Sequence, residues 1–236
     1  MQSMTDARAI VVGSTGGIGA ALVRELSGRG FGVTGLARRP AWAGDIAVDV
    51  TDELSLEAAA EQLRARAPFD IIMVATGLLH DGDLHPEKSL RDVDPAHLLK
   101  SFAVNTVGPA LAAKHLTPLL PKTERGIFAA LSARVGSIGD NRLGGWYGYR
   151  ASKAALNMII KTLAIELARS RPKAICVGLH PGTVDTQLSA PFQASVAAGR
   201  LFTPDHAAHQ LIEVIDALTS GDSGRCFDWD GKPIPP

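Results

Sequence analysis

The sequence lacks several features that would place a protein outside the cell or in a membrane. It has only two cysteines, Cys176 and Cys226, which stand far apart and show no metal-type spacing. Reduced thiols are therefore expected, rather than a disulfide framework or a metal site. No apolar run approaches the ~18 residues that a membrane-spanning helix needs, the best stretch being Ile71–Ala75. The start of the chain, Met1–Asp6, lacks the basic flank and apolar segment of a signal peptide.

An excess of one charge is lacking as well. Lys and Arg together number 24, and so do Asp and Glu together. Neither nucleic acid nor an acidic membrane surface is therefore expected as a partner. No internal repeat or low-complexity linker divides the 236 residues, and this length can bury a core without disulfides or metals. We expect one domain, residues 1–236, in a soluble cytoplasmic enzyme.

A glycine-rich turn near the N-terminus is the first motif with chemical meaning. Ala7–Gly13 is a short apolar run typical of a buried strand, and Ala20–Leu26 has a helical pattern. Gly13, Gly17 and Gly19 lie at the junction. A strand, a glycine turn and a helix in this order predict a dinucleotide-phosphate site. The glycines let the backbone approach a pyrophosphate, and the helix start supplies amides and the positive end of a dipole.

The second motif is the pair Tyr149 and Lys153. The run from Ala151 to Pro172 is free of glycine and rich in Ala, Leu and Ile, which predicts a long helix. Residues four apart share a helix face, so an ammonium group would lie near the phenol and lower its pKa. Such a tyrosine can exchange a proton with a substrate oxygen. Taken alone, the pair is more typical of a surface tyrosine and a solvated lysine.

Together, the Gly-x-x-x-Gly-x-Gly turn and the Tyr-x-x-x-Lys pair resemble the short-chain dehydrogenase/reductase family over essentially the whole chain. The resemblance implies an α/β fold: a single-domain Rossmann fold with a doubly wound parallel sheet of about seven strands and helices on both faces. It implies that Tyr149 is the proton donor, that Lys153 lowers its pKa, and that Ser132 polarises a carbonyl. Asn105 would hold a water that connects Lys153 to solvent, although an asparagine in an apolar helix, here expected over residues 96–120, can also simply kink it.

The resemblance also implies a cofactor site. Its expected residues are Gly13, Ser14, Thr15, Gly17, Ile18, Gly19, Arg38, Asp49, Val50, Ala75, Thr76, Gly77, Tyr149, Lys153, Pro181, Gly182, Val184 and Thr186. One departure is Val74–Gly77, which keeps the glycine but lacks both asparagines of the family's usual Asn-Asn-Ala-Gly.

Cofactor choice is expected to depend on the end of the second strand. In NAD-binding versions of this fold an acidic residue binds the adenosine ribose there, whereas this chain has Ala37 followed by Arg38. A guanidinium can bind a ribose 2′-phosphate through two parallel hydrogen bonds. NADP(H) is therefore the expected cofactor, and NAD(H) is the alternative. If no phosphate binds here, Arg38 and Arg39 are instead a solvated arginine pair at the end of the strand.

The segments between these motifs carry weaker signals. His80–Pro95 contains several His, Asp and Glu residues, and a solvated loop is expected rather than a metal site. Trp146 and Tyr147 are interpreted as pocket wall or core, and His180 as a packed histidine. Gln187–Leu201 is interpreted as a lid over the substrate.

Several stretches most resemble the C-factor and sniffer-like carbonyl reductase branch, among them His180–Thr186 and Phe227–Lys232. This likeness implies NADP(H)-dependent reduction of a ketone or aldehyde to an alcohol, or the reverse. The expected partner is a small-molecule carbonyl or alcohol, and a homodimer or homotetramer is expected through the helices around Asn105 and Ala151–Ala168. A nucleotide-binding signalling protein or sensor with little turnover is the alternative function.

Overall fold

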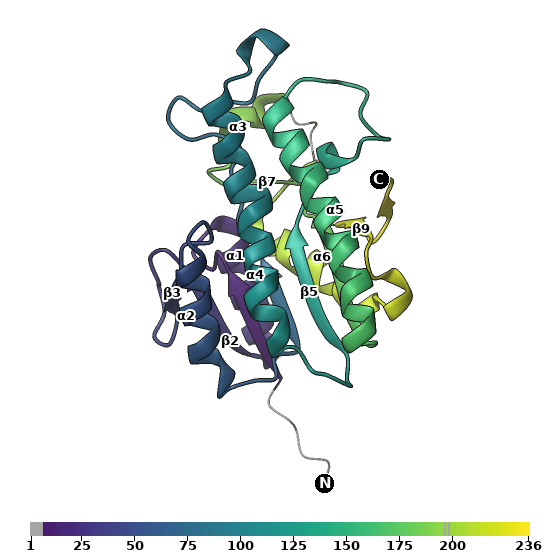
Figure 1. Cartoon of the computed structure of the whole chain (residues 1–236). Helices are drawn as coiled ribbons and strands as arrows, with labels where there is room; N and C mark the ends of the chain where they lie inside the picture. Colours follow the sequence, from purple (N-terminus) through teal and green to yellow (C-terminus); the bar gives the residue numbers. More distant parts are fainter. Residues whose placement is uncertain (1–6, 196, 198) are drawn as a thin grey trace.

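The computed structural model describes residues 7–195, 197 and 199–236. Its centre is an eight-stranded sheet in the order β10–β9–β6–β5–β4–β1–β2–β3 (Figure 1). The strands are β1 Arg8–Val12, β2 Gly32–Ala37, β3 Ile46–Ala47, β4 Ile71–Val74, β5 Gly126–Leu131, β6 Ala174–His180, β9 Cys226–Asp228 and β10 Pro233–Ile234. All neighbours are parallel except β9 and β10. The expected doubly wound parallel sheet is confirmed, and it exceeds seven strands because the chain end folds back on β9.

Helices cover both faces of this sheet, as expected (Figure 1). The α-helices are α1 Gly17–Gly28, α2 Glu53–Arg64, α3 Pro95–Phe102, α4 Gly108–Leu116, α5 Tyr147–Ser170 and α6 Pro204–Ala217. Shorter helical segments are η1 Leu90–Asp92, η2 Ala103–Val107, η3 Thr117–Leu119, η4 Arg134–Gly136, η5 Ala190–Ser195 and η6 Ser220–Asp222. A separate parallel pair is formed by β7 Thr183–Val184 and β8 Leu201–Phe202. Within the described residues no helix combines the length and apolar character needed to cross a membrane.

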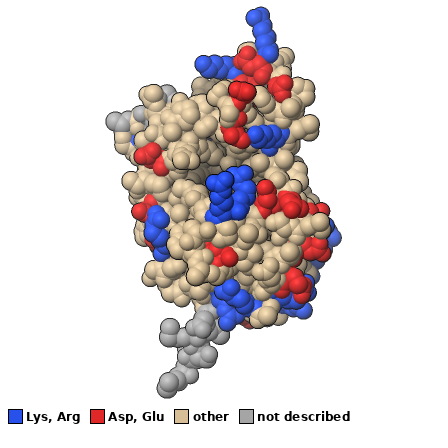
Figure 2. All heavy atoms as spheres, turned by 90° about the vertical axis from the view of Figure 1, so that its left-hand side faces the viewer, with Lys and Arg blue, Asp and Glu red and all other residues tan. Residues whose placement is uncertain are grey.

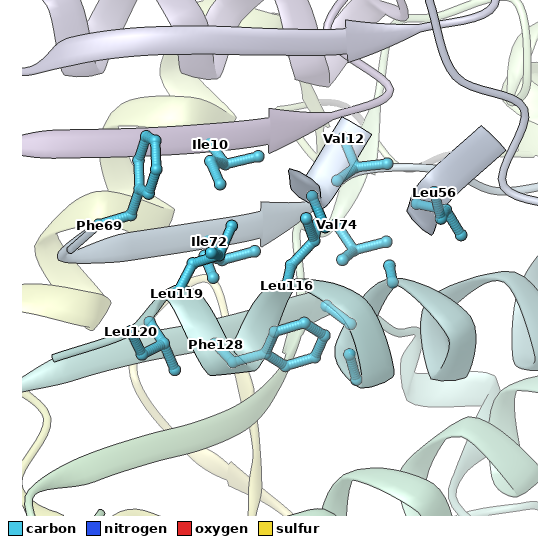
Figure 3. Packing of buried hydrophobic residues seen from close by; sticks show 14 of the residues in the cluster. Ile10, Val12, Leu56, Phe69, Ile72, Val74, Leu116, Leu119, Leu120 and Phe128 are labelled. Carbon is cyan, nitrogen blue, oxygen red and sulfur yellow. The ribbon is translucent and has the colours of Figure 1, made fainter. Parts of the chain in front are cut away.

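Alternation along the strands divides the core into two layers. Ile10, Ile72 and Phe128 point to the face that α2, α4 and α5 cover, and Figure 3 shows them packed together. Their chain neighbours, such as Val11 and Met73, point to the opposite face against α1 and α6. Full burial of one such side chain contributes roughly 1.5–3 kcal/mol. The two packed layers therefore fix the positions of the strands and of their carboxyl ends. The candidate site residues lie at these ends.

Side-chain caps set the starts of two helices at Asp52 and Thr203, residue types that favour this position and that each precede a helical pattern in the sequence. The carboxylate of Asp52 accepts a hydrogen bond from the backbone N–H of Leu54 at the start of α2. Thr203 does the same for His206 at the start of α6, where Pro204 occupies the first turn. Each such cap stabilises its helix by about 1 kcal/mol.

The helix expected over residues 96–120 is interrupted. It runs as α3, the π-helical turn η2, α4 and η3, with the buried Asn105 inside the π-helical turn. The side chain of Asn105 pairs with the backbone of Leu78, accepting from its N–H and donating to its carbonyl, both at 2.8 Å. Single π turns are rare and concentrate at functional sites, so this break lies where the sequence predicts chemistry.

Candidate active site

The candidate site lies along one edge of the sheet. Because β1, β4, β5 and β6 run parallel, the segments that follow them meet at the same edge. The glycine turn follows β1, Ala75–Gly77 follows β4, Ser132 follows β5, and Pro181–Gly182 follows β6. The fold thus brings together segments that are more than 150 residues apart in sequence, and the remaining question is how their side chains are arranged.

The glycines of the turn are required by contact and conformation. Gly13 has a φ of 83°, a backbone conformation that other residues rarely adopt. A Cβ on Gly17 would lie 2.6 Å from Cγ2 of Thr186, and one on Gly19 would collide with the carbonyl oxygen of Gly13. The N-cap of α1, Gly16, makes no side-chain cap, and the first turn contains no acidic residue. The amides at this helix start therefore suit an anion such as a pyrophosphate.

The segment after β4 connects the glycine turn to the catalytic candidates. Cγ2 of Thr76 stands 3.0 Å from the position of a Cβ on Gly13, and the Thr76 hydroxyl is buried without a hydrogen-bond partner. A Cβ on Gly77 would face Oδ1 of Asn105 and Nζ of Lys153, at 3.8 and 3.9 Å. The segment Ala75–Gly77 therefore lies between the glycine turn and the catalytic candidates Asn105 and Lys153.

Tyr149 and Lys153 project from the first turns of α5. Lys153 is buried, and its ammonium group donates to the carbonyl of Leu131 at 2.8 Å and lies 5.8 Å from the Tyr149 ring centroid. Burial raises the pKa of Tyr149 to about 12 and lowers the pKa of Lys153 to about 8. The expected lowering of the Tyr149 pKa is therefore not found, because desolvation is the cause that acts on the phenol in this structure and it favours the neutral form.

The sequence missed the role of Glu87, which was expected in a solvated loop. Glu87 is 6% exposed, and its carboxylate accepts a hydrogen bond from the backbone N–H of Gly148 at 3.0 Å. Its own carbonyl accepts from the backbone N–H of Trp146. A carboxylate at a helix N-terminus satisfies a free amide and interacts favourably with the helix dipole. Glu87 therefore starts α5 at Tyr147 and sets where Tyr149 stands; no local sequence pattern pairs positions so far apart.

Asn105 joins the π-helical turn to α5. Besides its two bonds to Leu78, its amide nitrogen donates to the hydroxyl of Ser152 at 3.1 Å, and the hydroxyl of its neighbour Thr106 donates to the Ser152 carbonyl at 2.7 Å. These hydrogen bonds of the Asn105 side chain are thus all made to other groups of the protein. The role of Asn105 in a proton relay to Lys153 stays a prediction. In the structure, its two bonds to Leu78 hold the segment that follows β4 in place.

Ser132 lies at the end of β5 in contact with a residue that the sequence did not single out. The Ser132 hydroxyl donates to Oδ1 of Asn157 at 2.6 Å, and the Cys226 thiol approaches the same oxygen at 3.2 Å. Burial raises the pKa of Cys226 to about 11, so its thiol keeps the proton that it donates. Asn157 stands one turn after Lys153 on α5, and it orients the Ser132 hydroxyl.

The expected adenosine side of the site has less defined contacts. Arg38 is exposed at the end of β2. The pKa of Asp49 is lowered by hydrogen bonds from the backbone and side chain of Thr51, with a smaller contribution from Arg38. Val50 is buried against Gly108. Figure 2, seen from the left-hand side of Figure 1, shows charges of both signs on this face and a group of Lys and Arg side chains beside a hollow.

An aromatic wall stands beside Tyr149. Trp146 has a φ of 53°, a strained conformation for a bulky residue, and its ring centroid lies 6.2 Å from that of Tyr149 and 5.1 Å from that of Phe192. Phe192 in turn lies 6.0 Å from His80. Tyr147 is 41% exposed, so it is not a core residue, and its expected place in a pocket wall stays a prediction. Trp146 stands beside Tyr149 as the expected wall.

The segment after β6 approaches the glycine turn. Gly182 has a φ of 77°, Pro181 precedes it, and Val184 is buried in β7. Thr186 contacts Gly17, as described above, and Ser189 donates to the carbonyl of Val184. Part of the expected lid, Gln187–Leu201, forms η5 and the start of β8; the expectation for its residues 196 and 198, like that for Met1–Asp6, lies outside the described residues.

No group of three or more His, Cys, Asp or Glu side chains that could hold a metal ion occurs within residues 7–195, 197 and 199–236. The loop interpretation of His80–Pro95 is correct for its exposed residues, such as Asp81 and His85, but not for Glu87.

Known proteins resemble this chain in sequence and in fold. Residues 7–197 match a family model described as short chain dehydrogenase. The C-signal protein of Myxococcus xanthus is 36% identical over 148 residues, which cover 62% of this chain and 83% of that protein. The 1-hydroxy-2-glutathionyl-2-methyl-3-butene dehydrogenase of Rhodococcus sp. (strain AD45) is 33% identical over 232 residues, covering 94% and 96% of the two chains.

Solved structures share the arrangement of the sheet and helices. The NADPH-bound carbonyl reductase from chicken fatty liver has a TM-score of 0.83 at 22% identity, with 97% of this chain and 93% of that chain covered. A short-chain dehydrogenase/reductase from Burkholderia multivorans with bound NADP has a TM-score of 0.81 at 25% identity, with 98% and 99% covered. The carbonyl reductase Sniffer of Drosophila melanogaster has a TM-score of 0.82 at 22% identity, with 98% and 99% covered.

Proposed function

This chain belongs to the short-chain dehydrogenase family, and we propose that it is an NADP(H)-dependent oxidoreductase of the carbonyl-reductase type that reduces a ketone or aldehyde to an alcohol. The observation that carries the proposal is the position of Tyr149, Lys153 and Ser132. All three lie where α5 and β5 meet the sheet edge that holds the glycine turn.

The residues present suit a dinucleotide. The uncapped start of α1 and the bare glycines Gly13, Gly17 and Gly19 leave room and free amides for a pyrophosphate. Arg38 supplies a cation for a ribose 2′-phosphate, and Ala37 adds no carboxylate to repel it. Pro181, Gly182, Val184 and Thr186 would border the nicotinamide end. When bound, the cofactor supplies the hydride. The NADP-bound solved relatives support this choice.

Tyr149 is proposed as the proton donor. A phenol with a pKa of about 12 is protonated at neutral pH, which suits reduction, where the new alkoxide needs a proton. The opposite direction would first require a phenolate, which burial disfavours. Lys153 is proposed to stabilise that phenolate after proton transfer and to bond a cofactor ribose.

Ser132 is proposed to polarise the substrate carbonyl. Its hydroxyl already has a donor geometry toward Asn157, so a substrate oxygen would replace Asn157 as acceptor. Asn105 would position the Leu78 backbone and support the proton path to Lys153.

A signalling protein that binds the cofactor without turnover is the second candidate, because the C-signal protein is 36% identical over 148 residues. The deciding experiment follows NADPH oxidation over a panel of ketones, aldehydes and quinones, with Tyr149→Phe as the control. Carbonyl-dependent oxidation that the variant loses supports the enzyme. Tight NADPH binding without oxidation of any panel member would support the sensor.

We also propose a homodimer or homotetramer. Leu99 and Val107, on α3 and the π-helical turn, and Met158 and Ile165, on α5, are exposed large apolar side chains. Packing between copies would cover them.

A further inference from the structure

A cavity of about 300 Å³ lies at the same sheet edge, one strand beyond Ser132. Its walls come from the segment after β5, the β6–β7 turn, β8 and the β9–β10 hairpin. The lining residues are Arg134, His180, Gly182, Thr183, Arg200, Phe202, Asp228, Trp229, Asp230 and Lys232. Neither Tyr149, Lys153, Asn105 nor the glycine turn contributes to it.

Strand register places this cavity next to the proposed reaction centre. Leu131 pairs with Leu179, so Ser132 and His180 are the next residues on adjacent parallel strands. His180 pairs in turn with Asp228 on β9. A Cβ on Gly178, two residues before His180, would lie 3.4 Å from Cβ of Ser132 and 3.2 Å from Ile160 of α5. Since alternate strand residues share a face, Ser132, His180 and Asp228 form one row on the α5 side, and Figure 1 shows β9 beside α5.

Two of the three cations that line the cavity, Arg134 and Lys232, are paired with carboxylates. The guanidinium of Arg134 pairs with Asp228 at 2.8 Å and with Asp140 at 3.0 Å, and Lys232 pairs with Asp230. Asp228 is buried, and its other oxygen accepts backbone N–H groups of Asp230 and Lys232. Arg200 forms no ion pair with any other described residue. The pKa of Lys232 is raised by its hydrogen bond to Asp230, while the nearby charge of Arg200 opposes that shift. Among the described residues, the exposed guanidinium of Arg200 is therefore the cavity cation without a carboxylate partner.

Polar and aromatic groups complete the walls. Burial lowers the pKa of His180 to about 4, so the imidazole is neutral at physiological pH, and its Nδ1 is buried without a hydrogen-bond partner. Phe202 packs against Trp229 with ring centroids 4.7 Å apart. A buried nitrogen without a partner is costly unless a ligand or water satisfies it. These walls suit a carboxylate beside Arg200 and an apolar linker along Phe202 and Trp229.

We propose that this cavity binds the distal part of the substrate, and that this part carries a carboxylate. The substrate class is then a keto acid whose carbonyl lies at Ser132 and Tyr149 while its carboxylate lies beside Arg200. This assignment rests on the proposed carbonyl reduction, and it makes Arg200 a specificity residue.

The test uses ω-keto acids of several chain lengths, each paired with its methyl ester. With the unaltered protein and NADPH, the KM of the best acid should be roughly 3- to 10-fold below that of its ester, because only the acid gains a charge-assisted contact. Added salt should raise the KM of the acid and leave that of the ester nearly constant. Arg200→Glu should reverse the ratio of the two KM values, whereas Arg64→Glu, at an exposed arginine on α2, should leave the ratio as it was.

Two results would overturn the inference while leaving the reductase intact: equal KM values for every acid and ester pair, or an acid preference that persists in Arg200→Glu. If another ketone or aldehyde is reduced but no acid or ester is, the inference fails as well; if no carbonyl compound is reduced, the proposed function fails instead. Calorimetry then still tests the cavity, since the acid should bind the unaltered protein more tightly than it binds Arg200→Glu, and equal binding would refute the site.

Discussion

The hydroxyl of Ser132 donates a hydrogen bond to the side-chain oxygen of Asn157 at 2.6 Å. Asn157 is on α5, the helix that also carries Tyr149 and Lys153. One rigid helix therefore positions three groups: the proposed acid Tyr149, the ammonium group of Lys153, and the Asn157 oxygen that orients the hydroxyl of Ser132. A carbonyl oxygen that takes the place of Asn157 would receive a hydrogen bond whose direction is already set, which is the preorganisation that catalysis requires.

Asn157→Ala should lower kcat by roughly 10-fold with little change in the dissociation constant of NADPH, because Ser132 loses its orientation and the cofactor contacts remain. Asn157→Asp keeps an acceptor oxygen and should restore part of kcat. Steady-state kinetics on both variants, with Ser132→Ala and the double alanine variant, measure the effect. A purely structural role predicts that the two alanine losses multiply, whereas a role through Ser132 predicts little further loss in the double variant.

Tyr149→Phe keeps the ring and removes the acid. Turnover should fall by roughly 10²- to 10⁴-fold with little change in cofactor affinity. Tyr147→Phe is the matched control, since Tyr147 lies two residues earlier on the same helix and is exposed. Equal losses in the two variants would show that the active-site register is wrong.

Titration of the phenol tests the electrostatics directly. The sequence contains two tyrosines, so Tyr147→Phe leaves Tyr149 alone. Its tyrosinate absorbance should stay absent through pH 10 and develop near pH 12, because burial raises the pKa from 10.0. The folded state then holds a proton that the unfolded state has lost, so this contribution to stability is full below pH 10 and disappears toward pH 12. A midpoint below 10 would instead favour control by the charge of Lys153.

Association should depend on the exposed apolar residues of α5. Sedimentation at micromolar concentration should show particles of two or four times 24.8 kDa. Met158→Glu with Ile165→Glu should shift them toward the monomer, because a buried unpaired carboxylate is costly. Leu54→Glu serves as the control, because Leu54 is also an exposed apolar residue but lies on α2. Only 24.8 kDa particles from the unaltered protein would refute assembly.

Cofactor choice should depend on Arg38. NADPH should bind roughly 10-fold more tightly than NADH, with a preference that weakens in high salt, because the exposed guanidinium is screened. Ala37→Asp with Arg38→Ser should reverse the preference, and Arg39→Ser should change it less. Dissociation constants for both cofactors decide the matter, and tighter NADH binding by the unaltered protein would leave Arg38 as a solvated charge.

Local patterns in the sequence were enough to predict much of this molecule. Some features depend only on neighbours within a few residues: the glycine turn, the Tyr149–Lys153 spacing, and the caps Asp52 and Thr203. The order of the strands depends on a regular alternation of residue types. For that reason the fold class and the family could be predicted without coordinates.

The remaining features depend on residues that meet only in three dimensions. Glu87 was expected in a solvated loop, yet it caps α5 from 61 positions away. Asn157 and Cys226 reach one another across α5 and β9, and the cavity beside Ser132 is assembled from four separate segments. The raised pKa of Tyr149 also depends on the tertiary structure, because spacing reveals the neighbouring charge but not the loss of solvent. The sequence alone determined the helices and strands, because their residue types recur at helix and strand periods. Only the tertiary structure decided which side chains are buried and which distant residues touch, and these two properties set the pKa values and hydrogen bonds of the site.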